Sequence, residues 1–257
     1  MKNVKKIIRI IDKIVNWLIG LFFLPLLLYG LYGLWDSNQI NQQAEALQYE
    51  AYKPTEKNFI SFTELQEKNP EVFGWLTIDN THIDYPLVQG EDNSKYVNTD
   101  ALGEFSLSGS LFLDCDNQKD FSDLNNIIYG HHMAKDAMFG EIENFQEPSY
   151  FEEHSYGKLY YEGNWYRIEF FAFLLADAYD RVLYDTMLRR KEDVSVYLEY
   201  IQQHATYFKE LSFGEDERFL TLSTCTSEST NGRHLLIGRI MEITKKTQGE
   251  PQYEKEK

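Results

Sequence analysis

Two stretches of the chain combine residue types that could break and remake an amide bond. In RFLTLSTC, Cys225 ends an alternation of apolar and polar residues, and Arg233 opens the next apolar run. A thiolate is a strong nucleophile, and a nearby guanidinium favours the thiolate and offers fixed N–H donors to a developing oxyanion. In NNIIYGHHM, His131 follows an apolar run, where an imidazole can act as general acid or base. Together these residues indicate covalent catalysis by cysteine.

Each of these residues also has a plainer interpretation. A lone cysteine is often a small buried apolar residue, and an arginine at a strand end often makes a surface ion pair. His131 and His132 are adjacent, and adjacent side chains of an extended segment point in opposite directions, so the pair is not expected to bind one ion. HExxH and CxxC spacings are missing from the sequence, so no metal site is predicted.

Short strands must position these residues. Strand-like runs bounded by Gly, Asn and Asp recur from residue 74 onward: GWLTID, HIDYPLV, SGSLFLD, NNIIYG, GKLYYEG, WYRIEFFAFLLA, RFLTLSTC and HLLIGRIMEI. Their spacing predicts an antiparallel barrel or sandwich. One long helix over residues 185–211, with apolar residues at helical spacing, is predicted between two late strands. If Cys225 and Arg233 flank a hairpin loop, they lie side by side at the rim of the sheet.

The N-terminus carries a membrane signal. Residues 14–35 are uncharged and apolar, and as a helix they reach roughly 33 Å, enough to cross a bilayer. Basic residues precede the stretch, so residues 1–13 are expected in the cytoplasm and the remainder outside. A cleaved secretory signal is the alternative, but the residues that follow the stretch make a poor cleavage site. An uncleaved anchor is therefore predicted.

Composition limits the remaining possibilities. The 257 residues carry a net charge of −16, which argues against nucleic-acid binding because phosphates require a basic face. Residues 36–58 are polar and predict a stalk, residues 59–244 form one domain, and residues 245–257 read as a disordered tail. The two cysteines, Cys115 and Cys225, permit one disulfide or none.

The combination of these features resembles a known family. TLSTC followed by an arginine that opens an apolar strand, IIYGHHM upstream and an N-terminal anchor are similar to the sortases, and the forms YGHHM and LSTC to class B. The resemblance implies a mainly β fold: a closed sortase-like barrel with N-terminal helices, a long helix inserted before the last strands, and a transmembrane helix. By this likeness, Cys225 is the nucleophile, His131 the acid/base and Arg233 the oxyanion donor.

The resemblance also implies a substrate groove and a reaction. Ser223, Thr224 and Tyr129 are expected to line the groove, with Tyr129 in a supporting role. The implied reaction cleaves a C-terminal sorting signal of a secreted protein after threonine. It then transfers the acyl group to an amine of peptidoglycan or to a pilin lysine, and no cofactor takes part.

Three other classes of function remain open at this stage. A membrane-anchored cysteine hydrolase would use water as the acceptor, and would release only free acid in the presence of an added amine. A non-enzymatic surface module would bind a ligand and would function unchanged after replacement of Cys225. An anchored metalloprotein using His131 and His132 would carry stoichiometric metal after purification.

Overall fold

The computed structural model describes residues 2–55, 60–188, 191–214, 216–226 and 229–243, and the predicted tail at residues 245–257 lies outside them. The chain divides into two compact units, residues 1–43 and 44–257. The first consists of helix α1, Lys2–Gln43, which includes Pro25. Its segment Lys5–Gln39 has a mean hydropathy of 2.1 and is long and apolar enough to cross a membrane. This helix is consistent with either a membrane anchor or a signal sequence.

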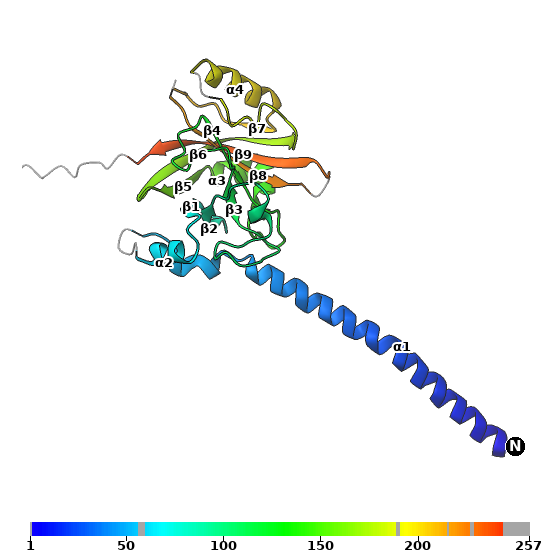
Figure 1. Ribbon diagram of the computed structural model, residues 1–257. Coiled ribbons are helices and arrows are strands. Elements are labelled where there is room, and N and C mark those ends of the chain that lie inside the picture. The colour runs from blue at the N-terminus through cyan, green and yellow to red at the C-terminus, as the bar shows by residue number, and fades with distance from the viewer. Residues whose placement is uncertain (1, 56–59, 189–190, 215, 227–228, 244–257) are drawn as a thin grey trace, which may run out of the picture. The chain divides into compact units, whose positions relative to one another are not determined.

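The second unit is built mainly of strands, shown in Figure 1. The strands are β1 Val72–Ile78, β2 Asp84–Val88, β3 Leu111–Leu113, β4 Asn125–Tyr129, β5 Tyr156–Tyr161, β6 Asn164–Asp177, β7 Tyr207–Phe208, β8 Phe219–Cys225 and β9 Gly232–Glu242. The helices are η1 Ala46–Tyr52, α2 Ile60–Lys68, η2 Lys95–Val97, η3 Gly140–Gln146, α3 Pro148–Glu153 and α4 Lys191–His204. All the predicted strand runs therefore contain a strand.

The strands close into a barrel. They pair in the order β5-β1-β2-β3-β4-β8-β9-β6, and a further pairing of β5 with β6 completes the ring, while β7 extends outward from β6. The prediction of a purely antiparallel sheet was wrong at two places, because β2–β3 and β4–β8 are parallel. Both parallel pairs need long crossovers, and these were visible in the sequence only as loops and short helices.

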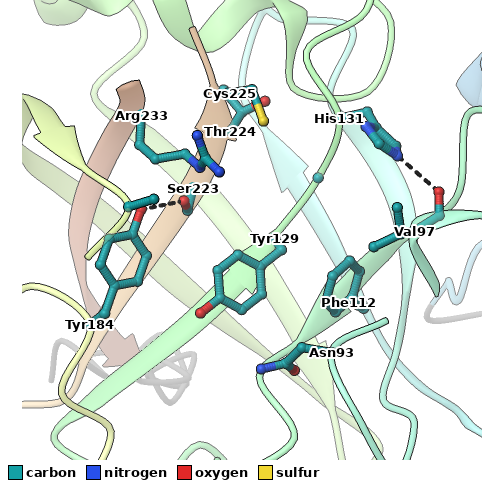
Figure 2. Close-up of a pocket in the computed structure, with 12 residues that line it drawn as sticks. Asn93, Val97, Phe112, Tyr129, His131, Tyr184, Ser223, Thr224, Cys225 and Arg233 are labelled. Carbon is teal, nitrogen blue, oxygen red and sulfur yellow. Dashed lines mark hydrogen bonds between the residues drawn. The ribbon is translucent and has the colours of Figure 1, made fainter. Parts of the chain in front are cut away.

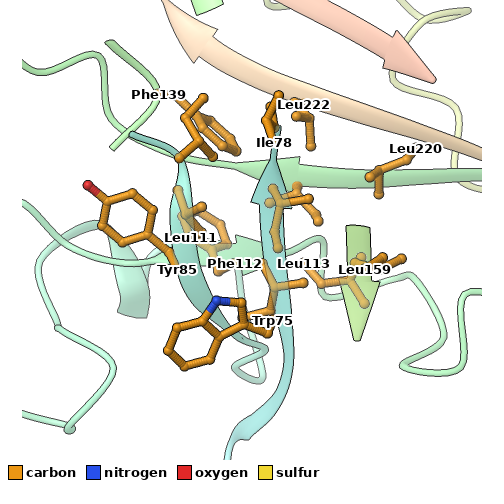
Figure 3. Packing of buried hydrophobic residues seen from close by; sticks show 14 of the residues in the cluster. Trp75, Ile78, Tyr85, Leu111, Phe112, Leu113, Phe139, Leu159, Leu220 and Leu222 are labelled. Carbon is orange, nitrogen blue, oxygen red and sulfur yellow. The ribbon is translucent and has the colours of Figure 1, made fainter. Parts of the chain in front are cut away.

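The core has two layers, one on each face of the strands that carry Cys225 and Arg233. Inside the barrel, Leu220 and Leu222 of β8 belong to one buried cluster with residues of other barrel strands, such as Ile78 and Leu159 (Figure 3). On the outer face, Phe219 packs beneath α4 with Tyr197. Strand β8 is consequently buried along its length, and Cys225 is the first exposed residue at its end. Burial on both faces fixes the register of β8 and so the position of the cysteine.

Two boundaries differ from the predicted ones. Helix α4 runs over Lys191–His204 and is shorter than the predicted 185–211, because residues 207–208 pair as a strand with β6 instead of continuing the helix. The compact unit begins at Ala44, so residues 44–55 of the predicted stalk pack on the barrel. Tyr49 is buried there, and the Tyr85 hydroxyl donates a hydrogen bond to the Ala44 carbonyl (2.9 Å). These apolar contacts were hidden by the polar composition of the segment.

Candidate active site

One pocket of about 380 Å³ brings together all six residues predicted to serve the reaction (Figure 2). Its lining comprises Asn93, Val97, Phe112, Tyr129, Gly130, His131, Ala178, Tyr184, Ser223, Thr224, Cys225 and Arg233. The predicted residues come from the ends of β4, β8 and β9, which lie next to one another in the sheet. The pocket therefore sits at one end of the barrel, where neighbouring strands terminate.

Cys225 and Arg233 form a directly opposed pair across the β8–β9 hairpin. Cys225 is exposed and its thiol is free. The Arg233 Nη1 donates hydrogen bonds to the carbonyls of Gly232 (2.8 Å) and Thr230 (3.3 Å), which hold the side chain over the hairpin. A guanidinium has five N–H donors, and these contacts use only one of its nitrogens. The others remain available to an oxygen that approaches the cysteine.

His131 lies across the pocket from Arg233, and Figure 2 draws the Cys225 sulfur between the two. Its Nε2 is 2.8 Å from the carbonyl oxygen of Val97. A carbonyl can only accept, so Nε2 carries the hydrogen in this contact, and the neutral ring presents its lone pair at Nδ1. The backbone around Val97 thereby orients the imidazole and selects the nitrogen that can exchange a proton.

Aromatic rings form one wall of the pocket. The rings of Tyr129 and Tyr184 are nearly parallel, at 5°, with centroids 6.3 Å apart, and Phe112 lies 5.3 Å from Tyr129. The hydroxyls of Tyr184 and Ser223 are 2.8 Å apart. Burial raises the pKa of Tyr184 to about 12, so its hydroxyl remains protonated at neutral pH. The wall is thus apolar, with two hydroxyls held together at its edge.

Tyr184 belongs to the segment between β6 and α4, and a buried amide anchors that segment to the barrel. The Asn125 side-chain nitrogen donates to the carbonyls of Leu183 (3.0 Å) and Asp185 (3.2 Å). Its oxygen accepts a hydrogen bond from the Thr221 hydroxyl at 2.8 Å. Because a buried amide is costly to leave unpaired, these bonds hold the segment firmly and place Tyr184 in the pocket.

The aromatic wall is also held by Asp114, which the sequence did not reveal. Its carboxylate accepts hydrogen bonds from the Tyr129 hydroxyl (2.8 Å) and the Asn93 side-chain nitrogen (2.9 Å). Burial and this carboxylate raise the pKa of Tyr129, which therefore stays a donor to Asp114. Asn93, Asp114 and Tyr184 carry no local motif, so only the three-dimensional arrangement identifies them.

The second cysteine lies behind this network and does not line the pocket. The backbone N–H of Cys115 donates to the Asn93 side-chain oxygen (2.9 Å), and its thiol is free. Burial and the flanking carboxylates of Asp114 and Asp116 raise the pKa of this thiol. A thiol held in the protonated form is a poor nucleophile. The raised pKa of the Cys115 thiol therefore favours Cys225 over Cys115 as the nucleophile.

Thr224 contributes a hydroxyl without a hydrogen-bond partner among the residues that the structure describes. The residue is 2% exposed and lines the pocket next to Cys225. A buried hydroxyl left unpaired costs free energy, which a ligand in the pocket would recover by pairing with it. This observation agrees with the predicted place of Thr224 in the substrate groove.

Gly130 precedes His131, and a larger residue there is expected to displace the imidazole. A Cβ at this position would clash with the Leu111 side chain and lie 2.6 Å from Cδ2 of Phe139. Since both neighbours are buried, Gly130→Ala should lower the free energy of unfolding by about 1–3 kcal/mol and also reduce turnover. Urea denaturation and an acyl-transfer assay measure the two effects. Gly214→Ala, where a Cβ would meet only the Glu217 side chain at 3.7 Å, an ordinary contact distance, is the control that should change neither.

Comparisons with known proteins agree with this fold. Residues 76–240 match the sortase domain family. Sortase B of Listeria monocytogenes is 32% identical over 182 residues, which cover 69% of this chain and 73% of that protein. A Streptococcus pyogenes class B sortase involved in pilus biogenesis superposes with a TM-score of 0.64 at 39% identity, covering 70% of this chain and 98% of that one.

A further solved structure, sortase B from the type II pilus of Streptococcus pneumoniae, gives a TM-score of 0.62 at 38% identity. It covers 71% of this chain and 99% of that one. The matched region includes the barrel strands from β2 to β8 and every residue of the pocket. The chain therefore belongs to the sortase family and is a class B sortase, a cysteine transpeptidase.

Proposed function

We propose that Cys225 is the nucleophile of this transpeptidase, His131 its acid/base and Arg233 its oxyanion donor. The observation that carries the proposal is the opposed pair of Cys225 and Arg233 in a pocket that His131 completes. Arg233 presents donors where negative charge develops during attack by the sulfur. Ser223, Thr224 and Tyr129 form the adjacent surface on which the substrate peptide lies.

The reaction proceeds through a thioester. The Cys225 thiolate attacks the carbonyl carbon of a threonine in a C-terminal sorting signal, and Arg233 stabilises the resulting oxyanion. The C–N bond breaks as His131 gives its proton to the departing amine. An incoming amine then loses a proton to His131 and attacks the thioester, which restores the thiolate and forms the new amide bond. The thioester retains the reactivity of the cleaved bond, so transfer is possible without a cofactor.

For the acceptor, the comparisons favour a pilin lysine over a peptidoglycan amine. The two streptococcal class B sortases associated with pili are 38–39% identical to this chain. The sortase B proteins of Listeria monocytogenes and Staphylococcus aureus are 32% and 26% identical. We infer that the enzyme joins secreted proteins to the lysine of a pilin subunit. An acceptor assay distinguishes this from the alternative, transfer to a peptidoglycan amine.

The apolar helix α1 supports a location at the cell membrane. Its charge pattern fits a single crossing with residues 1–13 in the cytoplasm and the catalytic domain outside. Substrates that carry a sorting signal are themselves delivered to this surface. Anchoring the enzyme there raises the effective concentration of both partners, which a two-substrate transfer requires.

Mass spectrometry of the intact enzyme tests the proposal directly. The enzyme is incubated with a panel of sorting-signal peptides and no amine. An acyl adduct on Cys225 is then expected, with the mass of the peptide fragment whose last residue is threonine. Addition of a lysine-bearing pilin peptide should convert the adduct into a ligated product. An adduct on Cys115, or free acid as the only product in the presence of amine, would contradict the proposed centre.

Arg233→Lys is expected to lower kcat by about 10²–10³-fold even though the positive charge is retained. A point ammonium cannot keep the Gly232 contact and also present the planar donors of a guanidinium. Steady-state transfer assays measure the change. Arg239→Lys on the same strand is the control, because Arg239 is paired with Glu169 away from the pocket (2.6 Å) and should affect stability only. Near-normal turnover of Arg233→Lys would assign the oxyanion to backbone donors.

A further inference from the structure

Two histidines and a glutamate meet on the far side of the catalytic strands. The Nε2 of His132 is 3.1 Å from Oε2 of Glu143, and the rings of His132 and His234 have centroids 6.3 Å apart. One potential ligand atom from each of the three residues lies within 4.8 Å of the other two. The residues come from the loop after β4, from η3 and from β9. His234 is distant in sequence from His132 and Glu143, so no spacing motif in the sequence predicted this set.

This set is chemically suited to a zinc ion. Two imidazoles and one carboxylate are a known zinc-binding combination, with ligand bonds of about 2.0–2.2 Å. In tetrahedral geometry such bonds place ligand atoms roughly 3.3 Å apart. The His132–Glu143 separation already meets that value, and a modest side-chain rotation closes the rest. Hard ions such as Mg²⁺ and Ca²⁺ prefer oxygen ligands and suit the site poorly.

The three residues differ in exposure, from a buried histidine to a partly exposed glutamate. An ion can therefore reach the site from the solvent on the glutamate side. His234 is 8% exposed, while the side chains of His132 and Glu143 are 24% and 44% exposed. The glutamate is therefore free enough to adjust, and solvent can supply the fourth ligand on that side. The buried histidine is set on β9, opposite Thr224 of β8, and so provides a rigid end to the site.

We propose that His132, Glu143 and His234 form a Zn²⁺ site that clamps the loop after β4 to strand β9. The loop contains left-handed residues at Lys135, Asp136 and Met138, and its backbone is held by the bond from Phe139 N–H to the His131 carbonyl (3.0 Å). A metal bond to His132 adds a further restraint to this conformation. His132, Glu143 and His234 do not line the pocket of Cys225, so the ion is a structural clamp and takes no part in the proposed transfer.

Zinc binding to the full-length protein in detergent micelles tests the inference. Cys115→Ser and Cys225→Ala are introduced first, so that no thiol competes for the ion. Calorimetric titration should show one Zn²⁺ per chain, and Co²⁺ should give the visible absorption of a four-coordinate site. Loss of a hydrogen-bond partner of a metal ligand alone weakens binding by about 10–100-fold. His132→Gln should therefore weaken binding by more than about 100-fold, and Glu143→Gln by at least about tenfold.

His82→Gln is the matched control. His82 also contacts a glutamate, with Nδ1 3.1 Å from Oε1 of Glu141, but its neighbouring group contains no second imidazole. The variant should bind Zn²⁺ with unchanged affinity. If His82→Gln abolished binding, or if Glu143→Gln bound as tightly as the parent protein, the site would be elsewhere and the proposal overturned. If the parent protein bound no zinc, the proposal would also be overturned, and His132 and Glu143 would form a simple histidine–carboxylate pair.

Hydrogen exchange reports on the backbone of the clamped loop itself. At a Zn²⁺ concentration that saturates the parent protein but not Glu143→Gln, zinc should slow exchange of the amides between residues 132 and 139 in the parent protein and have a smaller effect in Glu143→Gln. Glu143 is partly exposed, so this replacement is not expected to disturb the fold, and circular dichroism checks that it does not. Equal protection in both proteins would contradict the clamp.

Discussion

Replacement of Cys225 by alanine is expected to lower acyl transfer by more than about 10⁴-fold while the barrel remains folded. In the proposed mechanism the thiol forms the thioester, and no other side chain that lines the pocket can replace it as a comparable nucleophile. Cys225 is exposed at the end of β8, so loss of its sulfur leaves no cavity in the core. Transfer of a labelled peptide to an amine measures the activity, and thermal unfolding measures the fold.

The second cysteine makes this experiment specific. Cys115→Ser should retain transfer activity, because the Cys115 thiol lies outside the pocket and has a raised pKa. A large loss in Cys115→Ser together with a small one in Cys225→Ala would exchange the roles of the two residues and contradict the assignment.

His131→Gln is expected to reduce turnover by about 10²–10⁴-fold, the usual contribution of general acid–base catalysis. Glutamine can donate the same hydrogen bond to the Val97 carbonyl that Nε2 of the imidazole makes at 2.8 Å. The replacement therefore removes proton exchange and keeps the surrounding backbone contact. Single-turnover kinetics should show slow release of the amine and slow resolution of the thioester.

His204→Gln is the companion variant. The Nδ1 of His204 also contacts a backbone carbonyl, that of Tyr200 at 2.8 Å, but on the exposed face of α4 and away from the pocket. Turnover of this variant should match that of the parent enzyme. If His131→Gln were equally active, proton transfer would have to come from solvent or from another group.

Much of this arrangement could be predicted because local signals agree with the fold. Alternating residues in RFLTLSTC define a strand with two distinct faces, and both faces prove to be buried. The polar loop that follows predicts a hairpin, and the register then places Cys225 opposite Arg233. The long apolar stretch at the N-terminus likewise predicts one helix, which extends further at both ends than the apolar residues do.

The remaining features depend on contacts between distant segments. Asp114 acts through two partners from other elements, and the parallel pairing of β4 with β8 joins strands about 90 residues apart in the sequence. Tyr184 is placed in the pocket by contacts of its segment with distant residues, such as the Asn125 amide and the Ser223 hydroxyl. The length of the helix before the last strands was also overestimated, since two residues of the expected helix pair with β6. Such interactions leave no periodic trace in a single sequence.

Within one pocket, the position of Cys225 and the position of the Tyr184 segment, which Asn125 anchors, are set by different parts of the fold. The Cys225 sulfur takes its position from a strand enclosed by core on both sides, whereas the Tyr184 segment is held by the packing of Leu183 and by hydrogen bonds to the Asn125 amide. In the proposed mechanism, exchange of this segment is expected to change peptide recognition while the strand that carries Cys225 stays as it is. A graft of residues 178–185 from another sortase is the natural unit for redirecting this enzyme to a new peptide.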